Sequence, residues 1–337
     1  MRHLSLIPVL GACLTVSSTF LIASSSSAEP PAAAQCQVHG TAQPAVNTVI
    51  SDAQGRALAR FSGGDTALQV SEFPRDPHGK ARIETGTGTG SFRVRGFVDA
   101  GSLPLYTAAS VPVSAGHVWI APHRRVNLLN ASGDKLRVEK KVTTPLQQTF
   151  TGSAPCGSFS LDPGTAAGFS PPGDARGYEL KRDSLDLYDD AESGTLIATL
   201  VRSPATEAVL FFSTERKGAW VHIEYQGEVI VDAWAKAADL AMLPRGETID
   251  QLAPSILQHT RPQMAFQGQP QLVKTHKEVA LRLAAKDGEP MIGVIEPDTE
   301  TYVLDRVAGW ANVMPKSLNV VPPTDGQFWV KSADLGL

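Results

Sequence analysis

The sequence predicts a mostly β protein built from several small barrels in tandem, and three observations support this fold class. From Cys36 onward, short apolar alternations are broken by Gly, Pro, Asp and Ser roughly every 8–12 residues, the pattern of small barrels and sandwiches. Helical periodicity is nearly absent, since the one candidate, residues 249–257, contains Pro254, which breaks or kinks a helix. A seven-residue pattern also recurs along the chain.

This recurring pattern, which we call the closing segment, runs from an aromatic residue through a small apolar residue, a charge and a small pair to Ser or Asp and then Leu. It reads FVDAGSL at 97–103, WAKAADL at 234–240 and WVKSADL at 329–335. Each copy follows alternating apolar residues. We therefore expect a strand that enters a tight turn and places one Leu under a small barrel.

A second shared element lies upstream of each closing segment and sets the boundaries of the units. It reads KARI at 80–83, AWVHI at 219–223 and GWANV at 309–313, with a fourth instance, KLRV, at 135–138. The fourth instance is followed by CGSFSL at 156–161, which ends in Ser-Leu at the matching place. Four degenerate units follow from this spacing. Their predicted ranges are 37–103, 104–163, 182–243 and 275–337, with a Pro/Gly-rich linker at 164–181 and an insertion or linker at 244–274.

The third and fourth units resemble bacterial SH3-like domains, small five-stranded barrels found in exported proteins. The fourth unit carries Ile292-Gly293, Gly309-Trp310, Val313 and the segment from Trp329-Val330 to Leu335. The third unit is similar through Trp220, Ile223 and the segment from Trp234 to Leu240. The first unit lacks Trp, and Cys156 interrupts the closing strand of the second. The resemblance implies a mostly β fold of tandem small SH3-like β-barrels.

The first 28 residues have the features of a secretory signal peptide. Arg2 precedes an apolar run from Leu4 to about Ala23, and Ser26 and Ala28 form a small-residue cleavage site. We therefore expect an exported protein, periplasmic or extracellular. Two other interpretations remain open: a lipobox ending at Cys13, which would anchor the protein as a lipoprotein, and an uncleaved membrane anchor.

Cysteine usage agrees with export. Cys13 lies in the leader, so Cys36 and Cys156 remain in the mature chain, and two cysteines in an oxidising compartment most simply form a disulfide. This bridge would tie the start of the first unit to the end of the second, making one compact block. The competing interpretation is a catalytic thiol at Cys156.

Charge and motifs narrow the function. The net charge is −4 and basic residues occur only in short groups, so the chain lacks the electrostatic footprint of a nucleic-acid-binding protein. No other segment has the roughly 20 apolar residues of a membrane span. Zinc-hydrolase ligand spacings, a G-x-S-x-G elbow and a P-loop are also missing from the sequence. We therefore predict no cofactor, no metal and no catalytic residues.

Aromatic residues are the ligand-binding candidates, because their faces stack on sugars and on peptide prolines. Each also has an alternative role in barrel core and closure. Two further patterns each have more than one interpretation. The acidic run at 186–192 is either a cation or basic-peptide site or a solvated loop. GTGTG at 86–90 is either a phosphate loop or a hairpin turn. The five aromatic candidates are Tyr106, Tyr188, Trp220, Trp310 and Trp329.

The sequence thus predicts an exported, non-catalytic binding protein of tandem SH3-like domains that recognises peptidoglycan or a cell-envelope peptide. One alternative is a structural or adaptor protein of the envelope that binds a protein partner. The other is a cell-wall hydrolase with an unrecognised site built from carboxylates.

Overall fold

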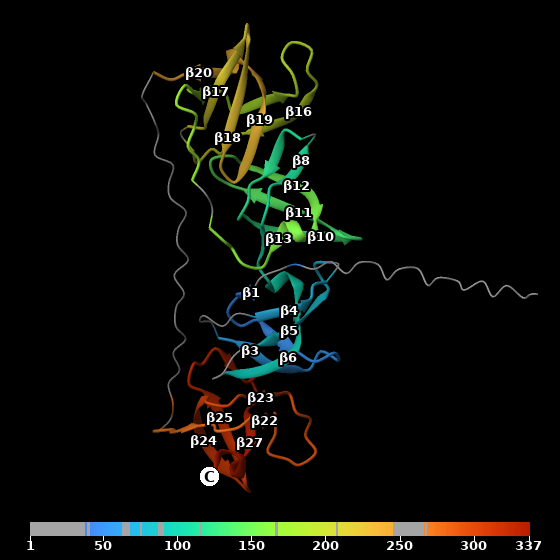
Figure 1. Ribbon diagram of the computed structural model, residues 1–337, viewed down its shortest axis with the longest axis vertical. Coiled ribbons are helices and arrows are strands. Elements are labelled where there is room, and N and C mark those ends of the chain that lie inside the picture. Colours follow the sequence, from blue (N-terminus) through green and yellow to red (C-terminus); the bar gives the residue numbers. More distant parts are fainter. Residues whose placement is uncertain are drawn as a thin grey trace, which may run out of the picture. The chain divides into compact units, whose positions relative to one another are not determined.

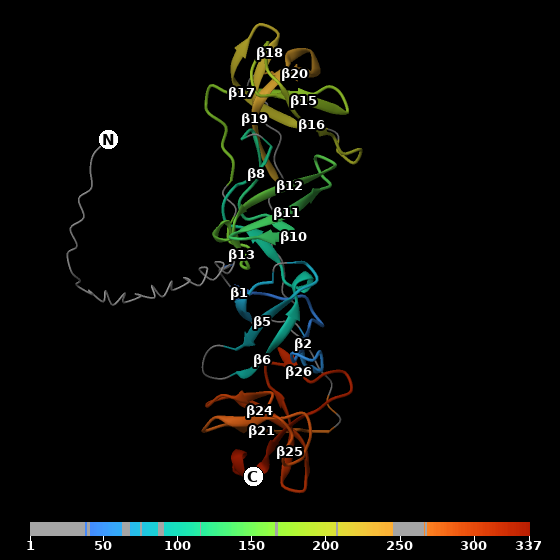
Figure 2. The ribbon, with the colours of Figure 1, turned by 90° about the vertical axis from the view of Figure 1, so that its right-hand side faces the viewer.

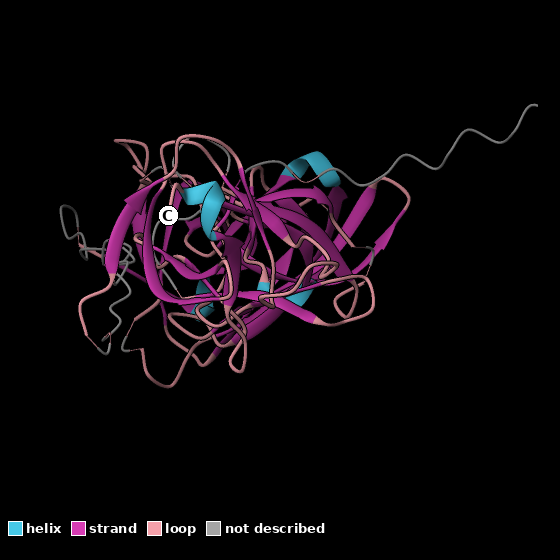
Figure 3. Cartoon of the chain, turned by 90° about the horizontal axis from the view of Figure 1, so that it is seen from below, coloured by secondary structure: helices cyan, strands magenta, loops and turns pink. Residues whose placement is uncertain are grey.

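The computed structural model describes residues 38, 41–62, 68–74, 76–86, 91–114, 116–165, 168–206, 208–244, 266 and 268–337. Within these ranges the regular elements are antiparallel strands in four sheets and four short 3-10 turns, with no α-helix and no closed barrel. Figure 3 shows the strands in magenta and the short turns in cyan. The predicted mostly β class is confirmed. The leader at 1–28 and the helix candidate at 249–257 lie outside the described residues.

The first two units contribute the strands of the N-terminal half. The first unit contains β1 (Thr41–Ala42), β2 (Val49–Ser51), β3 (Ala57–Phe61), β4 (Leu68–Glu72), β5 (Lys80–Thr85), β6 (Phe92–Asp99) and the turn η1 (Ala100–Ser102). The second contains β7 (Leu105–Thr107), β8 (Val111–Ser114), β9 (Val118–Ile120), β10 (Arg125–Ser132), β11 (Lys135–Val142), β12 (Gln148–Pro155), η2 (Cys156–Ser158) and β13 (Phe159–Ser160).

The third and fourth units share a first strand, a hairpin, a three-stranded meander and a 3-10 turn, but the fourth has an extra strand within its meander and the third has one after its turn. The third contains β14 (Arg176–Leu180), β15 (Ser184–Tyr188), β16 (Leu196–Val201), β17 (Leu210–Lys217), β18 (Trp220–Gln226), β19 (Val229–Lys236), η3 (Ala237–Asp239) and β20 (Leu240–Met242). The fourth contains β21 (Gln271–Lys274), β22 (Val279–Leu281), β23 (Gly293–Ile295), β24 (Glu300–Val307), β25 (Trp310–Pro315), β26 (Val320–Val321), β27 (Phe328–Lys331) and η4 (Ser332–Leu335). β14 and β21 lie in segments predicted as connectors, yet each pairs with the following meander.

A meander of three antiparallel strands forms the middle of every unit, with one register throughout. The meanders are β4–β5–β6, β10–β11–β12, β17–β18–β19 and β24–β25–β27. In each, the first strand carries a register shift, which marks a bulge that bends and twists the strand. The second and third strands then place two buried residues opposite each other: Ala81 and Val98, Leu136 and Ala154, Val221 and Ala235, Ala311 and Val330.

The closing segments form the four 3-10 turns, as the sequence predicted, and each turn is held by the same hydrogen bond. The first N–H of the turn donates to the carbonyl just before the middle strand: Ala100 to Gly79 (3.0 Å), Cys156 to Asp134 (2.7 Å), Ala237 to Ala219 (2.8 Å) and Ser332 to Gly309 (2.9 Å). The residue that closes each turn is buried in the apolar core: Leu103, Phe159, Leu240 and Leu335.

In the second unit, the closing position differs from the one we predicted. The sequence suggested Ser160-Leu161 as the match to the other closing segments, but the turn spans Cys156–Ser158 and is followed directly by Phe159. Phe159 therefore takes the place of Leu, two residues earlier than expected. The sequence pattern pointed to Leu161 because Phe and Leu can both fill a buried apolar position, and Leu161 is itself buried.

Strand pairing joins the second unit to the third and the fourth unit to the first. β9 pairs with the start of β19, and β23 pairs with the start of β6. Figure 1 labels three of these strands, β6, β19 and β23. The register is the same in both joints. Ile120 lies opposite Val229 and Ile295 lies opposite Phe92, and each partner lies five residues before the aromatic that opens its closing segment.

Each joint also has a reciprocal contact. β26 of the fourth unit pairs with β3 of the first. Figure 2 labels β26 next to β2, the strand that pairs with β3 within the first unit. In the other joint, Leu146 forms an isolated bridge with Arg202. Strand edges that would otherwise expose unpaired N–H and C=O groups are thus covered by a neighbouring unit. Among the described residues, strand pairing between units therefore joins the first unit to the fourth and the second to the third. The compact block of the first and second units, expected from a Cys36–Cys156 bridge, stays a prediction because Cys36 lies outside the described residues.

Cys156 is buried in η2 and is not a free thiol. This argues against the catalytic-thiol interpretation. Cys36 lies outside the described residues, so its pairing with Cys156 stays a prediction. Among the residues that the structure describes, no helix is long and apolar enough to cross a membrane.

Tyr225, in the core of the third unit, makes stability depend on alkaline pH. Burial raises the pKa of Tyr225 to about 12, and the nearby Glu228 carboxylate adds to the rise while Arg124 opposes it. An unfolded tyrosine titrates near pH 10, so the folded state holds this proton more tightly. Stability is therefore fully present below about pH 10 and falls as pH rises toward 12.

We expect Tyr225→Phe to remove this part of the pH dependence, which is worth about 2–3 kcal/mol for a shift of two pKa units. Urea unfolding of the wild type and the variant at pH 9 and pH 12 measures it. The free energy of unfolding should fall more steeply for the wild type. Equal losses in both proteins would contradict the assignment.

Candidate functional site

One face of the third unit gathers aromatic and charged side chains. Along β18, Val221 and Ile223 point into the core with no exposed surface, so Trp220 and His222 point outward. Across the strands, Lys236 lies opposite Trp220, and Trp234 lies opposite both His222 and Tyr188. We call the set Tyr188, Trp220, His222, Trp234 and Lys236 the aromatic face.

Tyr188 and Trp220 provide the partly exposed ring pair of the aromatic face. Their rings meet edge to face, with centroids 5.0 Å apart and an interplanar angle of 84°. Both side chains are half-buried, whereas Trp234 beneath them is 6% exposed. Such a pair presents a ring face and a ring edge side by side, an arrangement suited to stacking on a flat apolar group.

Basic side chains flank these rings. The Nζ atom of Lys236 lies 5.6 Å from the Tyr188 ring centroid and 5.9 Å from that of Trp220. The Nζ atom of Lys217 lies 4.6 Å from the Trp234 ring. An ammonium group at these distances is attracted by the negative face of the ring. The site therefore combines aromatic surface with positive charge.

His222 is the member of the aromatic face that packs against Trp234. Its ring lies 4.9 Å from the Trp234 ring, and its Nε2 atom is 2.9 Å from an Asp232 carboxylate oxygen. These contacts fix the imidazole plane against the indole, so His222 supports Trp234.

In the fourth unit, the matching position is closed. Trp310 occupies the place of Trp220, but it is 6% exposed and the Arg282 guanidinium and the Lys331 ammonium each lie 5.6 Å from its ring centroid. Asp287 pairs with Lys331 at 2.9 Å, and this hydrogen bond holds the pKa of the Asp287 carboxyl below its usual range. Trp329 is also buried. These tryptophans have the core and closure role that the sequence left open.

Of the five predicted aromatics, the structure brings only Tyr188 and Trp220 together as accessible rings. Tyr106 is half-buried in β7 of the second unit, opposite Arg125 and Ser160. Sequence reasoning missed three members of the aromatic face: His222, Trp234 and Lys236. Trp234 and Lys236 belong to the closing segment, which we had assigned to the fold alone. The antiparallel pairing of β19 with β15 and β18 brings these residues to the same face as Tyr188 and Trp220.

The two other patterns have structural explanations. Backbone N–H groups of Thr195 and Ala191 donate to the carboxylates of Asp189 (2.6 Å) and Asp190 (2.8 Å), so these acidic residues order their own loop. The strands β5 and β6 that flank the GTGTG segment pair antiparallel, and its hairpin interpretation stays a prediction. Its residues 87–90 lie outside the described residues.

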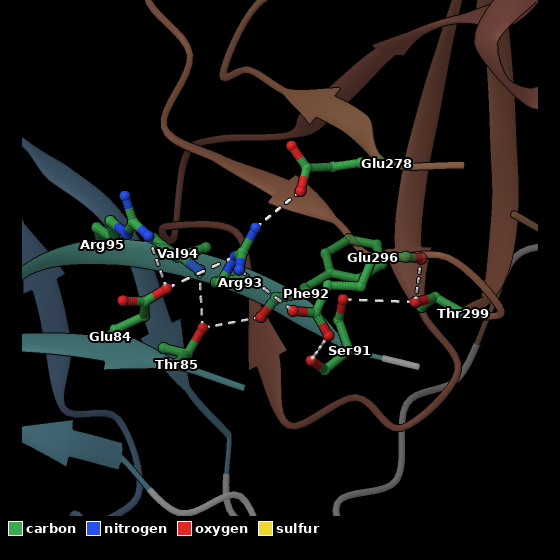
Figure 4. Close-up of polar contacts among 10 residues, drawn as sticks. All are labelled: Glu84, Thr85, Ser91, Phe92, Arg93, Val94, Arg95, Glu278, Glu296 and Thr299. Atoms are coloured by element: carbon green, nitrogen blue, oxygen red, sulfur yellow. Dashed lines mark hydrogen bonds and ion pairs between the residues drawn. The ribbon is translucent and has the colours of Figure 1, made fainter. Parts of the chain in front are cut away.

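The joint between the first and fourth units contains a hollow of about 610 Å³ lined by four arginines. Arg93, one of these four, lies 3.5 Å from a Glu84 oxygen, 2.8 Å from a Glu278 oxygen and 3.6 Å from a Glu296 oxygen. Figure 4 draws these three contacts. The other three arginines also have carboxylate partners: Arg56 with Glu289, Arg82 with Glu72 and Arg95 with Glu84. The charges are matched within the protein, so this region holds the joint together.

Glu296 is the most enclosed carboxylate of this network. The Ser91 hydroxyl donates to its side chain at 3.0 Å, and the Thr299 hydroxyl donates to its backbone carbonyl at 2.6 Å (Figure 4). Among the described residues no group of three or more His, Cys, Asp or Glu side chains is arranged to hold a metal ion.

Comparison with known protein families, curated proteins and solved structures gives no significant match to this chain.

Proposed function

We propose that this chain is an exported, non-catalytic binding protein of tandem SH3-like units that recognises peptidoglycan or a cell-envelope peptide through the aromatic face of the third unit. The single observation that carries the proposal is the accessible Tyr188–Trp220 pair. Signal-peptide features at residues 1–28 support export.

The SH3-like assignment is supported by the order of elements in the third unit. A first strand, a hairpin, a bulged three-stranded meander and a closing 3-10 turn follow one another, and β14 pairs with both β17 and β20. This order agrees with the family pattern that the sequence resembles. The other units keep the meander and the turn.

Co-sedimentation with purified sacculi tests the proposal. We expect the protein to pellet with the sacculi and Trp220→Ala to weaken binding by about tenfold to thirtyfold, the effect typical of a central aromatic at an interface. Met242→Ala is the matched control, because it removes an exposed apolar side chain of the same unit outside the aromatic face. Wild-type protein remaining entirely in the supernatant would refute the proposal.

The second candidate is a structural or adaptor role in the envelope. It is favoured by the two strand-paired joints, which show that these sheets dock readily on one another. Cross-linking in the envelope should then recover one specific protein partner. Recovery of sacculus fragments alone would favour the first proposal.

A further inference from the structure

Lys236 is a cation placed over the Tyr188 and Trp220 rings, and no carboxylate of the described residues forms an ion pair with it. The neighbouring Lys217, by contrast, is paired with Glu215 at 3.2 Å. An unpaired ammonium at a binding surface attracts an incoming anion.

The fourth unit provides an internal comparison. Lys331 occupies the position of Lys236, two residues after the aromatic that opens the closing segment and opposite the tryptophan of the middle strand. There, Asp287 neutralises the lysine at 2.9 Å, and Arg282 and Lys331 cover the ring of Trp310. In the fourth unit the tryptophan ring is thus covered and the lysine is ion-paired, whereas in the third unit the ring is half-buried and the lysine has no ion pair among the described residues.

We propose that the aromatic face of the third unit takes a ligand that carries a carboxylate beside the group stacked on Tyr188 and Trp220, and that Lys236 binds this carboxylate. The inference rests on the proposed function and specifies its ligand chemistry. A carboxylate is the appropriate partner because it forms a charge-assisted hydrogen bond with an ammonium group. In a cell wall, such a group is carried by the stem peptides and, once these are removed, by the lactyl groups of the glycan.

Two variants separate charge from shape. Lys236→Met removes the ammonium group while keeping an unbranched apolar chain over the rings, and Lys236→Arg keeps the charge. Lys331→Met is the matched control, because its charge is already neutralised by Asp287. All three are compared by co-sedimentation with native sacculi and with sacculi whose carboxyl groups have been converted to amides.

We expect wild-type binding to fall about tenfold on amidated sacculi, as for the loss of one hydrogen bond to a charged group. Lys236→Met should bind native sacculi about as weakly and show no further loss on amidation. Lys236→Arg and Lys331→Met should behave like the wild type. Titration with amidase-released stem peptides and, separately, with the peptide-free glycan strands then identifies which of the two carries the carboxylate.

The outcomes distinguish this inference from the proposed function. Equal wild-type binding to native and amidated sacculi, with Trp220→Ala still impaired, would overturn the role of Lys236 and leave the proposed function standing. A wild-type protein that binds neither preparation would overturn both.

Discussion

Replacing Arg93 with methionine is expected to lower the free energy of unfolding by about 2 kcal/mol, between the cost of breaking a surface ion pair and that of breaking a buried one. The Arg93 side chain is 29% exposed and contacts Glu84, Glu278 and Glu296. Without the guanidinium, three carboxylates are left close together at the joint between the first and fourth units. Both their mutual repulsion and the loss of their partner favour separation of the joint.

Denaturant unfolding measures this effect, with Arg95→Met as the control. Arg95 lies two residues along the same strand and is 70% exposed, and its one ion pair among the described residues is with Glu84, so its removal should cost less than about 1 kcal/mol. Adding Glu296→Gln to Arg93→Met should restore part of the stability, because Glu296 is the most buried of the three carboxylates. Equal losses for the two arginine variants would show that the network does not hold the joint.

Gly293→Val is expected to disrupt the same joint through steric overlap. A Cβ atom at position 293 would lie 2.2 Å from the Arg93 carbonyl oxygen and 3.0 Å from the Val94 Cα atom. Those atoms are backbone of the strand paired with β23, so neither side can move without breaking the pairing. We expect a loss of about 3 kcal/mol, at the upper end of the cost of overpacking.

Hydrogen exchange locates the damage from Gly293→Val. Amides of β6 and β23 should lose protection, while those of β9 and β19 in the other joint keep theirs. Gly157→Val is the control, because a Cβ there meets no atom within 4 Å. Uniform loss of protection throughout the chain would contradict the local role assigned to Gly293.

The predictable part of the fold was the part encoded locally. The closing segments and the middle strands are read from neighbouring residues, and the structure places all four in one register. Pairing between units could not be read in this way. β6 and β23 are about 200 residues apart, and the residues that meet, such as Phe92 and Ile295, carry the same apolar pattern as any buried strand.

The candidate site was predictable in residue type but not in accessibility. Trp220 and Trp310 follow the same Gly- or Ala-containing turn and look equivalent in the sequence. What separates them is a residue from elsewhere in the unit: Tyr188 of β15 in the third unit and Arg282, which follows β22, in the fourth. Whether a tryptophan is exposed therefore depends on a tertiary neighbour. The same applies to Lys236. In the fourth unit the loop after β22 supplies Asp287 as the partner of Lys331, whereas the described residues of the third unit supply no carboxylate that pairs with Lys236.

The first unit pairs with the fourth and the second with the third, so the inner pair lies within the outer pair along the chain. This arrangement affects the order in which the newly made protein folds. The chain emerges from its N-terminus, so the second and third units can complete their joint early, while the first must wait for β23 and β26 at the far end. Until then, the start of β6 and the outer side of β3 are uncovered strand edges, which are prone to pair with other chains. A product that ends before residue 268 would keep these edges uncovered. Residues 268–337 therefore protect the strand edges of the first unit from pairing with other chains.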